Sequence, residues 1–234
     1  MKNTFQDKSK LVNSVFSKVY KKYDLMNDIM SLGIHRLWKK KLMDWINPQL
    51  ENSLVDVASG TGDIAKIFSL KTKNSSSISC VEPNKEMLSI GKFNLKKFKN
   101  IKWYKAEAEK IPLNDNAFDF YTISFGIRNV SNINLSLDEA FRILKPGGRF
   151  FCLEFSKINN EFLNLIYKKY SNILPHIGKH IVGSSKPYEY LIKSIDDFYS
   201  QEELKNLIEK AGFTNVEYRN LSGGISAIHT GWKV

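Results

Sequence analysis

Cysteine is scarce in this chain, and its two copies lack the spacing of a metal site. Cys80 and Cys152 are the only cysteines among 234 residues, and both fall inside runs that we predict to be central strands. No secretory leader is recognisable ahead of them. We therefore interpret both as reduced, buried thiols of a cytoplasmic protein, and we expect no metal ion.

The sequence also lacks a long hydrophobic run. No apolar stretch approaches the roughly 20 residues that a helix needs to cross a bilayer, so we do not expect the chain to span a membrane. The composition, 42% hydrophobic and 25% charged, is instead typical of a globular protein. We expect one domain of moderate size over residues 1–234, with a sizeable core.

Acidic residues are outnumbered, because 24 aspartates and glutamates stand against 35 lysines and arginines, a formal net charge of +11. Such an excess can attract nucleic acid or anionic lipid headgroups, or it can simply solvate the surface. Most lysines are scattered, but short clusters occur at 38–41 and 92–99. Because no nucleic-acid-binding module is recognisable, we expect no nucleic-acid partner and favour peripheral contact with the inner face of a membrane.

Apolar runs and helical stretches alternate after residue 52, which predicts parallel strands joined by crossover helices. The predicted strands are 53–58, 78–82, 101–105, 118–124 and 149–155, with helices at 62–70, 84–98 and 134–145 between them. Asn84 is a candidate helix cap, and Pro146-Gly147-Gly148 is expected to stop the last of these helices.

The end of the chain departs from this alternation. A predicted helix at 201–211 is followed by two strand-like runs, 214–221 and 224–232, joined through Ser222-Gly223-Gly224 as a hairpin. The predicted fold class is therefore α/β: a doubly wound, mostly parallel, Rossmann-like sheet of seven strands with a C-terminal antiparallel hairpin.

The run from Ser53 to Asp63 joins a short apolar strand, an acidic residue inside it, and a glycine-punctuated turn into a helix. Gly60 and Gly62 allow the backbone to turn sharply and to approach a ligand. About 20 residues later a second strand ends in Glu82, at the spacing typical of a carboxylate that binds both hydroxyls of a ribose. Sites for NAD and for S-adenosylmethionine (SAM) share this device, so both cofactors stay open, as does a purely structural turn.

Five stretches carry a more specific resemblance. They are 23–27 (YDLMN), 60–63 (GTGD), 122–130 (TISFGIRNV), 144–149 (LKPGGR) and 153–157 (LEFSK). With these motifs the chain resembles, along almost its whole length, the ubiquinone/menaquinone biosynthesis C-methyltransferases, which are class I SAM-dependent methyltransferases. The block around Arg128 is the diagnostic one, whereas the proline-glycine motif is shared by many methyltransferases and marks only their fold.

The resemblance implies a set of residues that bind SAM as the cofactor. They are Thr61, Glu82, Glu107, Ala108 and Ser124, with Gly60 and Gly62 in the turn beside them. Glu82 would hold the ribose, and the pair 107–108 would cap the adenine ring. Two positions depart from the usual pattern, since Glu82 stands where Asp is frequent and Ser59 where Gly is frequent. The carboxylate is kept at 82, but the Ser59 side chain is expected to crowd the turn.

The reaction that the resemblance implies is methylation of a ring carbon of a polyprenylated benzoquinol or of demethylmenaquinol. Ring-carbon attack is easier from a phenolate, and a phenol with a pKa of about 10 needs a nearby cation at neutral pH. We assign this role to Arg128, with Asn129 and Tyr23 orienting the quinol oxygens. A structural ion pair is the alternative for Arg128, and core packing is the alternative for Tyr23.

Two segments are expected to form the acceptor side: helices within 1–50, at 8–30 and 34–46, and an apolar helical insertion at 157–195. The insertion either lines a channel for an isoprenoid tail and contacts lipid, or buries its own core. Two other functions stay open, a non-catalytic SAM- and lipid-binding partner of other quinone-biosynthesis enzymes and a nicotinamide oxidoreductase. A homodimer is also left open.

Overall fold

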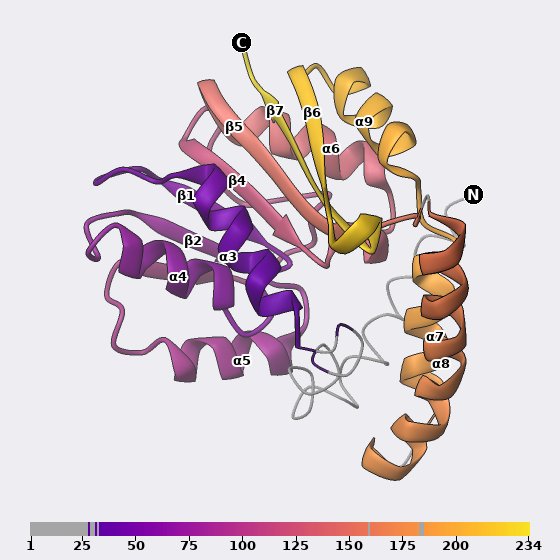
Figure 1. Cartoon of the computed structure of the whole chain (residues 1–234). Coiled ribbons are helices and arrows are strands. Elements are labelled where there is room, and N and C mark those ends of the chain that lie inside the picture. Colours follow the sequence, from indigo (N-terminus) through magenta and orange to yellow (C-terminus); the bar gives the residue numbers. More distant parts are fainter. Residues whose placement is uncertain (1–27, 29–30, 32, 159, 183–184) are drawn as a thin grey trace.

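A seven-stranded sheet forms the centre of the computed structural model, which describes residues 28, 31, 33–158, 160–182 and 185–234 (Figure 1). The strands are β1 (Leu54–Val57), β2 (Ile78–Val81), β3 (Ile101–Tyr104), β4 (Phe118–Ser124), β5 (Leu144–Phe155), β6 (Thr214–Leu221) and β7 (Ser226–Trp232). Their order is β3-β2-β1-β4-β5-β7-β6. The first five are parallel, and β7 runs antiparallel to both β5 and β6. The predicted fold class is confirmed.

Helices connect the strands as crossovers and cover both faces of the sheet (Figure 1). They are α3 (His35–Ile46), α4 (Asp63–Lys71), α5 (Lys85–Asn94), α6 (Ile133–Ile143), α7 (Glu161–Val182), α8 (Lys186–Asp196) and α9 (Gln201–Lys210), with short 3₁₀ turns η2 (Ile127–Asn129) and η3 (Ser222–Gly224). The predicted helices at 34–46, 62–70, 134–145 and 201–211 are confirmed within two residues at each end. The predicted helix at 8–30 lies almost wholly outside the described residues.

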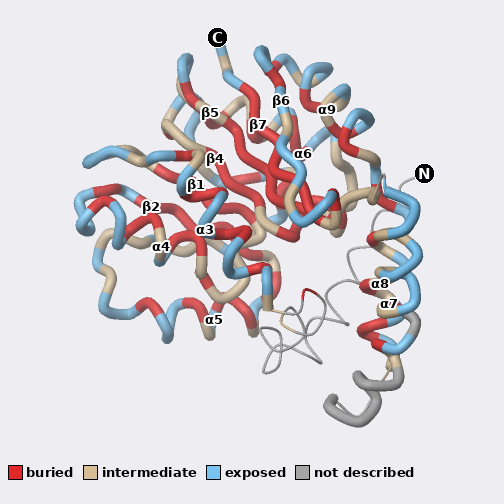
Figure 2. Tube along the Cα trace, viewed as in Figure 1, coloured by how far each residue is buried: buried red, intermediate tan, exposed pale blue. Residues whose placement is uncertain are grey.

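Two hydrophobic cores lie on opposite faces of the sheet. Because successive strand residues point to opposite faces, Leu54 packs with α3 and α4, whereas its neighbour Val55 packs with α6 and α9. Cys80 and Cys152 are buried free thiols in β2 and β5, as predicted. Figure 2 shows that burial is concentrated in the sheet and on the inner sides of the helices.

Three boundaries differ from the sequence prediction. Helix α5 is capped by Asn84, whose side chain accepts from the Met87 amide at 3.0 Å, but it ends at Asn94 rather than 98. Strand β5 begins at Leu144, because Gly147 and Gly148 already exchange backbone hydrogen bonds with Lys233, although Gly147 has a φ of 78°. Strand β7 begins at Ser226, because η3 occupies the hairpin turn.

Helices α7 and α8 form an antiparallel pair beside the carboxyl end of β5, from which they continue the chain (Figure 1). Their inner side chains, including Leu174, Tyr188 and Leu191, belong to the same core as α3 and α4. The outer face of α7 is exposed (Figure 2). The insertion at 157–195 therefore buries its inner apolar side chains against the sheet. It also leaves apolar side chains exposed on its outer face.

Candidate active site

The turn between β1 and α4 is shaped by three residues with positive φ. Ala58, Gly60 and Gly62 have φ of 51°, 57° and 90°. A Cβ added at Gly62 would lie 2.6 Å from Leu95 Cδ1 and 3.1 Å from the Trp103 ring. Glycine is therefore required at 62 for two reasons that need no ligand: its backbone conformation, and its close packing against Leu95 and Trp103.

Ser59 is held by the strands that flank the turn. Its hydroxyl donates to the Asp56 carbonyl oxygen at 2.6 Å, and its amide donates to the Val81 carbonyl oxygen at 3.2 Å. The side chain that we expected to crowd the turn instead stabilises it, because it satisfies a carbonyl group at the end of β1.

Glu82 joins two turns at the carboxyl edge of the sheet. Its carboxylate accepts from the Gly60 amide at 2.8 Å and from the Asn84 amide at 2.9 Å. Burial raises its pKa to about 7, although both amides act in the opposite direction. Each oxygen of a carboxylate can accept two hydrogen bonds, so each retains capacity for a ligand hydroxyl.

Glu107 and Ala108 follow β3 at the same edge. Ala108 is buried and Glu107 is exposed, and the charge of Glu107 contributes to the raised pKa of Glu82. The structure thus brings Glu107 within electrostatic range of Glu82, as expected for residues that contact one cofactor.

A small cavity opens beside the glycine turn. Its wall includes Gly60, Thr61 and Ser124, which we predicted as site residues, and also Asp56 and Lys39. Two buried polar atoms in this wall, Asp56 Oδ2 and Ser124 Oγ, have no hydrogen-bond partner within the described part of the chain. Buried polar groups are nearly always hydrogen-bonded in native proteins, so these atoms fit a polar ligand.

Asp56 is the most buried acid of this cavity. The Thr122 hydroxyl donates to its Oδ1 at 2.8 Å, and burial raises the pKa of Asp56 to about 7. The sequence showed an acid inside the first strand, but the prediction gave it no role. Lys39 was also missed, because it stands in a lysine cluster that we interpreted as surface.

Arg128 lies in η2 and is buried, so it does not stand free at the mouth of the sheet. Its guanidinium donates to Glu154 Oε1 at 2.5 Å and to the Phe125 carbonyl oxygen at 2.8 Å, and the two paired side chains are only 1% and 2% exposed. The ion pair, our alternative for this residue, is present. Burial raises the pKa of Glu154, and Arg128 opposes that shift.

The other two predicted catalytic residues have different outcomes. The Tyr190 hydroxyl of α8 donates to Asn129 Oδ1 at 3.0 Å, so Asn129 contacts the predicted acceptor side. Tyr23 lies outside the described residues. Burial raises the pKa of both Tyr167 and Tyr190, to about 12 for Tyr167, and the charge of Arg128 opposes this shift, which places these tyrosines of α7 and α8 in its field.

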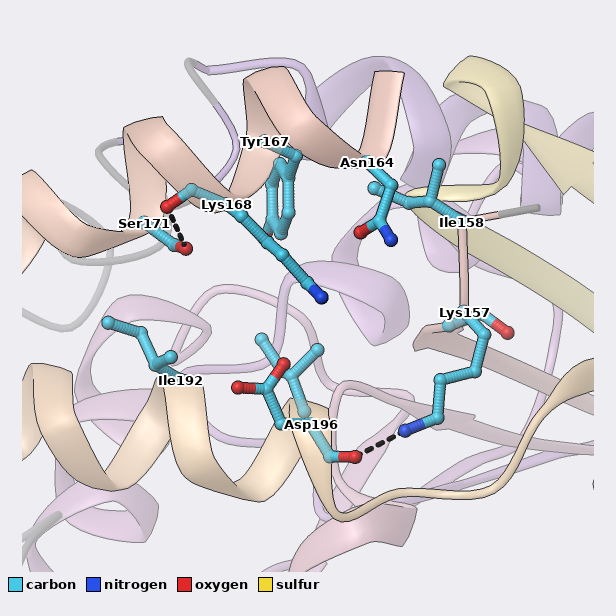
Figure 3. Close-up of a pocket in the computed structure, with 10 residues that line it drawn as sticks. Lys157, Ile158, Asn164, Tyr167, Lys168, Ser171, Ile192 and Asp196 are labelled. Carbon is cyan, nitrogen blue, oxygen red and sulfur yellow. Dashed lines mark hydrogen bonds between the residues drawn. The ribbon is translucent and has the colours of Figure 1, made fainter. Parts of the chain in front are cut away.

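A second cavity, of about 290 Å³, separates α7 from α8. Figure 3 shows Asn164, Tyr167 and Lys168 pointing from α7 toward α8, where Ile192 and Asp196 face them. The Tyr167 hydroxyl is buried with no hydrogen-bond partner among the described residues. Most of the residues that line this cavity are polar or charged, among them Lys157, Lys168 and Asp196, and its apolar part comes from Ile158, Ile192 and Ile195.

His229, in β7, is a buried histidine with a backbone partner. The His229 ring bonds the Gln201 carbonyl oxygen at 2.9 Å, and burial lowers its pKa to about 4, so it is a structural residue. No cluster of three metal-ligating side chains occurs among the residues that the structure places. None of the helices in that part has the length and apolarity that a bilayer crossing requires.

Comparison with known proteins supplies a family. The pattern of the ubiE/COQ5 methyltransferase family matches residues 3–233. A protein of Rickettsia bellii (strain OSU 85-389), named ubiquinone/menaquinone biosynthesis C-methyltransferase UbiE, is 51% identical over 235 residues, which cover 97% of this chain and 94% of the relative. The UbiE of Rickettsia prowazekii (strain Madrid E) is 49% identical over 237 residues, covering 98% and 95%.

Solved structures agree on the fold. A SAM-dependent methyltransferase from Thermotoga maritima superposes with a TM-score of 0.65 at 24% identity, covering 94% of this chain and 99% of that one. A SAM-dependent methyltransferase from Aquifex aeolicus gives 0.63 at 20% identity, covering 84% and 89%. At these identities the likeness concerns the fold alone.

Proposed function

This chain belongs to the ubiE/COQ5 methyltransferase family, and we propose that it is a C-methyltransferase that moves a methyl group from SAM to a ring carbon of a polyprenylated benzoquinol or of demethylmenaquinol. The observation that carries the proposal is the match over residues 3–233, together with relatives of about half-identical sequence that bear this activity in their name. The buried polar atoms beside the glycine turn support a ligand at the place where the fold binds one.

We propose that the carboxyl edge of the sheet holds SAM, which supplies a methyl group already activated on a sulfonium. Glu82 would accept from the ribose hydroxyls, and Glu107 with Ala108 would bound the adenine. Gly60, Thr61, Gly62 and Ser124 would surround the remaining part, with Ser124 Oγ donating the hydrogen bond that it lacks among the described residues.

We propose that Arg128 helps to stabilise the phenolate of the acceptor. Because its guanidinium is buried, it would act through neighbouring side chains rather than by direct contact. Its charge is paired with Glu154, and it acts electrostatically on Tyr167 and Tyr190, against the rise in pKa that burial gives their hydroxyls. The Tyr190 hydroxyl already donates to Asn129, so Tyr167, whose hydroxyl has no hydrogen-bond partner among the described residues, would donate to the phenolate oxygen. Asn129 would be positioned by Tyr190, and Tyr23 is assigned on the family motif alone.

Two assays test the proposal. Thermal shifts with SAM, S-adenosylhomocysteine (SAH) and NADH identify the cofactor. A response to NADH alone would indicate an oxidoreductase and contradict the assignment as a methyltransferase. Transfer of a labelled methyl group to reduced short-chain benzoquinone and naphthoquinone, measured side by side, separates an enzyme from a binding partner and ranks the two head groups. SAM binding without transfer to either acceptor would favour the partner role.

We further propose that α7 contacts the membrane in which such an acceptor resides. Among the side chains of α7 that the structure describes, the apolar Phe162, Leu165, Ile166 and Ile173 are exposed, and Lys169 is exposed between them. Apolar side chains beside lysines suit the interface of an anionic bilayer. We also propose that the whole chain is one domain, in which the segment 157–195 and the helices of 1–50 form the acceptor side. Contacts with other quinone-biosynthesis enzymes and a homodimer stay predictions.

Vesicle flotation with anionic lipid tests this contact. Phe162→Ser is expected to weaken binding, whereas Phe93→Ser, which removes a similarly exposed ring from α5, is the matched control. The two side chains are 73% and 68% exposed, so the comparison isolates position from hydrophobicity. Equal losses from both variants, or no vesicle binding by the wild type at low salt, would contradict the proposal.

A further inference from the structure

One lysine of the cluster at 39–41 is not at the surface. Lys40 and Lys41 are exposed, but Lys39 is only 7% exposed and forms part of the cavity wall beside the glycine turn. A buried ammonium is costly unless it is paired. Its Nζ lies 2.6 Å from Asp63 Oδ2, at the first residue of α4.

The ion pair with Asp63 does not occupy all hydrogen-bond donors of the Lys39 ammonium. A lysine has three N–H donors, and Asp63 takes one of them. The side chain of Asp63 is 46% exposed, so the pair is open to solvent on one side. Lys39 therefore keeps donors for a ligand that enters the cavity, and this ligand should carry an anionic oxygen.

The same cavity offers an acid for the opposite charge. Asp56 is 1% exposed, and its Oδ2 has no hydrogen-bond partner within the described residues. Lys39 also acts electrostatically on Asp56, so cation and acid are near each other. A ligand group that carries both a carboxylate and an ammonium, the α-amino acid group, would complement the two together.

From this arrangement we infer that Lys39 binds the α-carboxylate at the methionine end of SAM, an inference that rests on the proposed function. Glu82 is not part of this cavity's wall and reaches the Gly60 amide instead, so ribose and amino acid would be recognised separately, on the two sides of the glycine turn. Lys39 is then a cofactor-binding residue supplied by α3, outside the sheet that provides the rest of the site.

Helix α3 is well placed to hold Lys39 in position. The neighbouring Trp38 is 2% exposed, its indole N–H donates to Ser222 Oγ at 2.9 Å, and its ring meets that of Phe155 edge-on at 5.9 Å between centroids. Because these contacts fix the helix before a ligand arrives, little ordering of α3 is needed on binding, which favours affinity.

The test compares ligands with and without the amino acid group, by calorimetry on the full chain. SAH carries the α-carboxylate, and 5′-methylthioadenosine keeps the adenosine and the sulfur but lacks the whole amino acid. Lys39→Met removes the ammonium and keeps most of the stem, with Lys40→Met as the exposed control on the same helix. We expect Lys39→Met to weaken SAH binding by about 10- to 100-fold, the range of a charge-assisted hydrogen bond, and to leave methylthioadenosine binding within about 2-fold.

The outcomes are separable. Equal weakening of both ligands, or of neither, would overturn the role of Lys39, because only a contact with the amino acid group produces a difference. If Lys39→Met fails to fold, Lys39→Gln and Lys39→Arg provide the comparison, with Arg expected to restore SAH binding and Gln not. Failure of the wild type to bind SAH at all would instead refute the proposed function.

Discussion

The buried ion pair between Arg128 and Glu154 allows a structural role to be separated from a catalytic one. In Glu154→Gln the side-chain carbonyl can still accept from the Phe155 amide, which Glu154 now binds at 2.9 Å, but the Arg128 charge loses its counterion. Both side chains are almost fully buried, so solvent cannot replace the lost carboxylate charge. Breaking such a pair from one side costs about 3–5 kcal/mol.

For a chain of this length each kcal/mol shifts Tm by about 2–4 °C, so Glu154→Gln is expected to lower Tm by about 6–20 °C. The exposed pair between Lys71 and Asp44 provides the control, since its side chains are 39% and 46% exposed and Asp44→Asn should cost less than about 1 kcal/mol. Circular dichroism melts of both variants at the same pH and protein concentration give the comparison.

The double variant Arg128→Met with Glu154→Leu completes the test. Replacing both partners by apolar residues of similar size removes the unpaired charge, so most of the lost Tm should return. Methyl transfer should not return if Arg128 polarises the acceptor's oxygens. A Tm for Glu154→Gln within about 2 °C of wild type would refute the reasoning about burial, and a double variant with full turnover would remove Arg128 from the chemistry.

Three further predictions follow from the site. Arg128→Lys should retain SAH affinity in calorimetry but lose most turnover, because a compact ammonium replaces the planar guanidinium, whose Nη1 donates to both Glu154 and Phe125. Gly62→Ala should destabilise the protein in urea more than Gly147→Ala, because both positions have positive φ but only Gly62 would clash with neighbours. Burial raises the pKa of Glu82 from 4.5 to about 7, so protonation of Glu82 stabilises the folded, ligand-free chain. This contribution to stability is complete below about pH 4.5 and is lost as pH rises through 7. In melts at different pH, Glu82→Gln should therefore show a smaller decline of Tm over this range.

The strands and crossover helices were predictable from the sequence because their signal is local. A few neighbouring residues are enough to predict a strand at 78–82, a strand at 118–124 and a helix start at Asn84. The insertion of β7 between β5 and β6 was not predicted, since a hairpin pattern fixes the pairing of its two strands but not which of them joins the sheet. The start of β5 was missed because Pro146 and two glycines are typical of a break, whereas Lys233, far along the chain, supplies the backbone hydrogen bonds that include this segment in the sheet.

The site divides in the same way. Gly60, Gly62 and Glu82 could be proposed as site residues because strand, turn and carboxylate follow one another along the chain. Lys39 could not, because its burial depends on where α3 packs, and a run of three lysines gives no sign that one of them faces inward. The partner of Arg128 was equally hidden, since Glu154 lies in the next strand of the sheet and only the register of β4 with β5 brings them together.

The segment 125–129 connects the two halves of the site through contacts on both of its sides. On one side, a Cβ at Gly126 would lie 2.4 Å from the Ala58 Cβ, so the end of β4 packs directly against the glycine turn. On the other side, Asn129 accepts from Tyr190 of α8. Phe125, with φ of 56°, holds the chain in a conformation that a phenylalanine rarely adopts, and its carbonyl is bound by Arg128. The segment 125–129 therefore contacts the glycine turn, the buried ion pair and α8 at once, so a substitution within it would disturb all three.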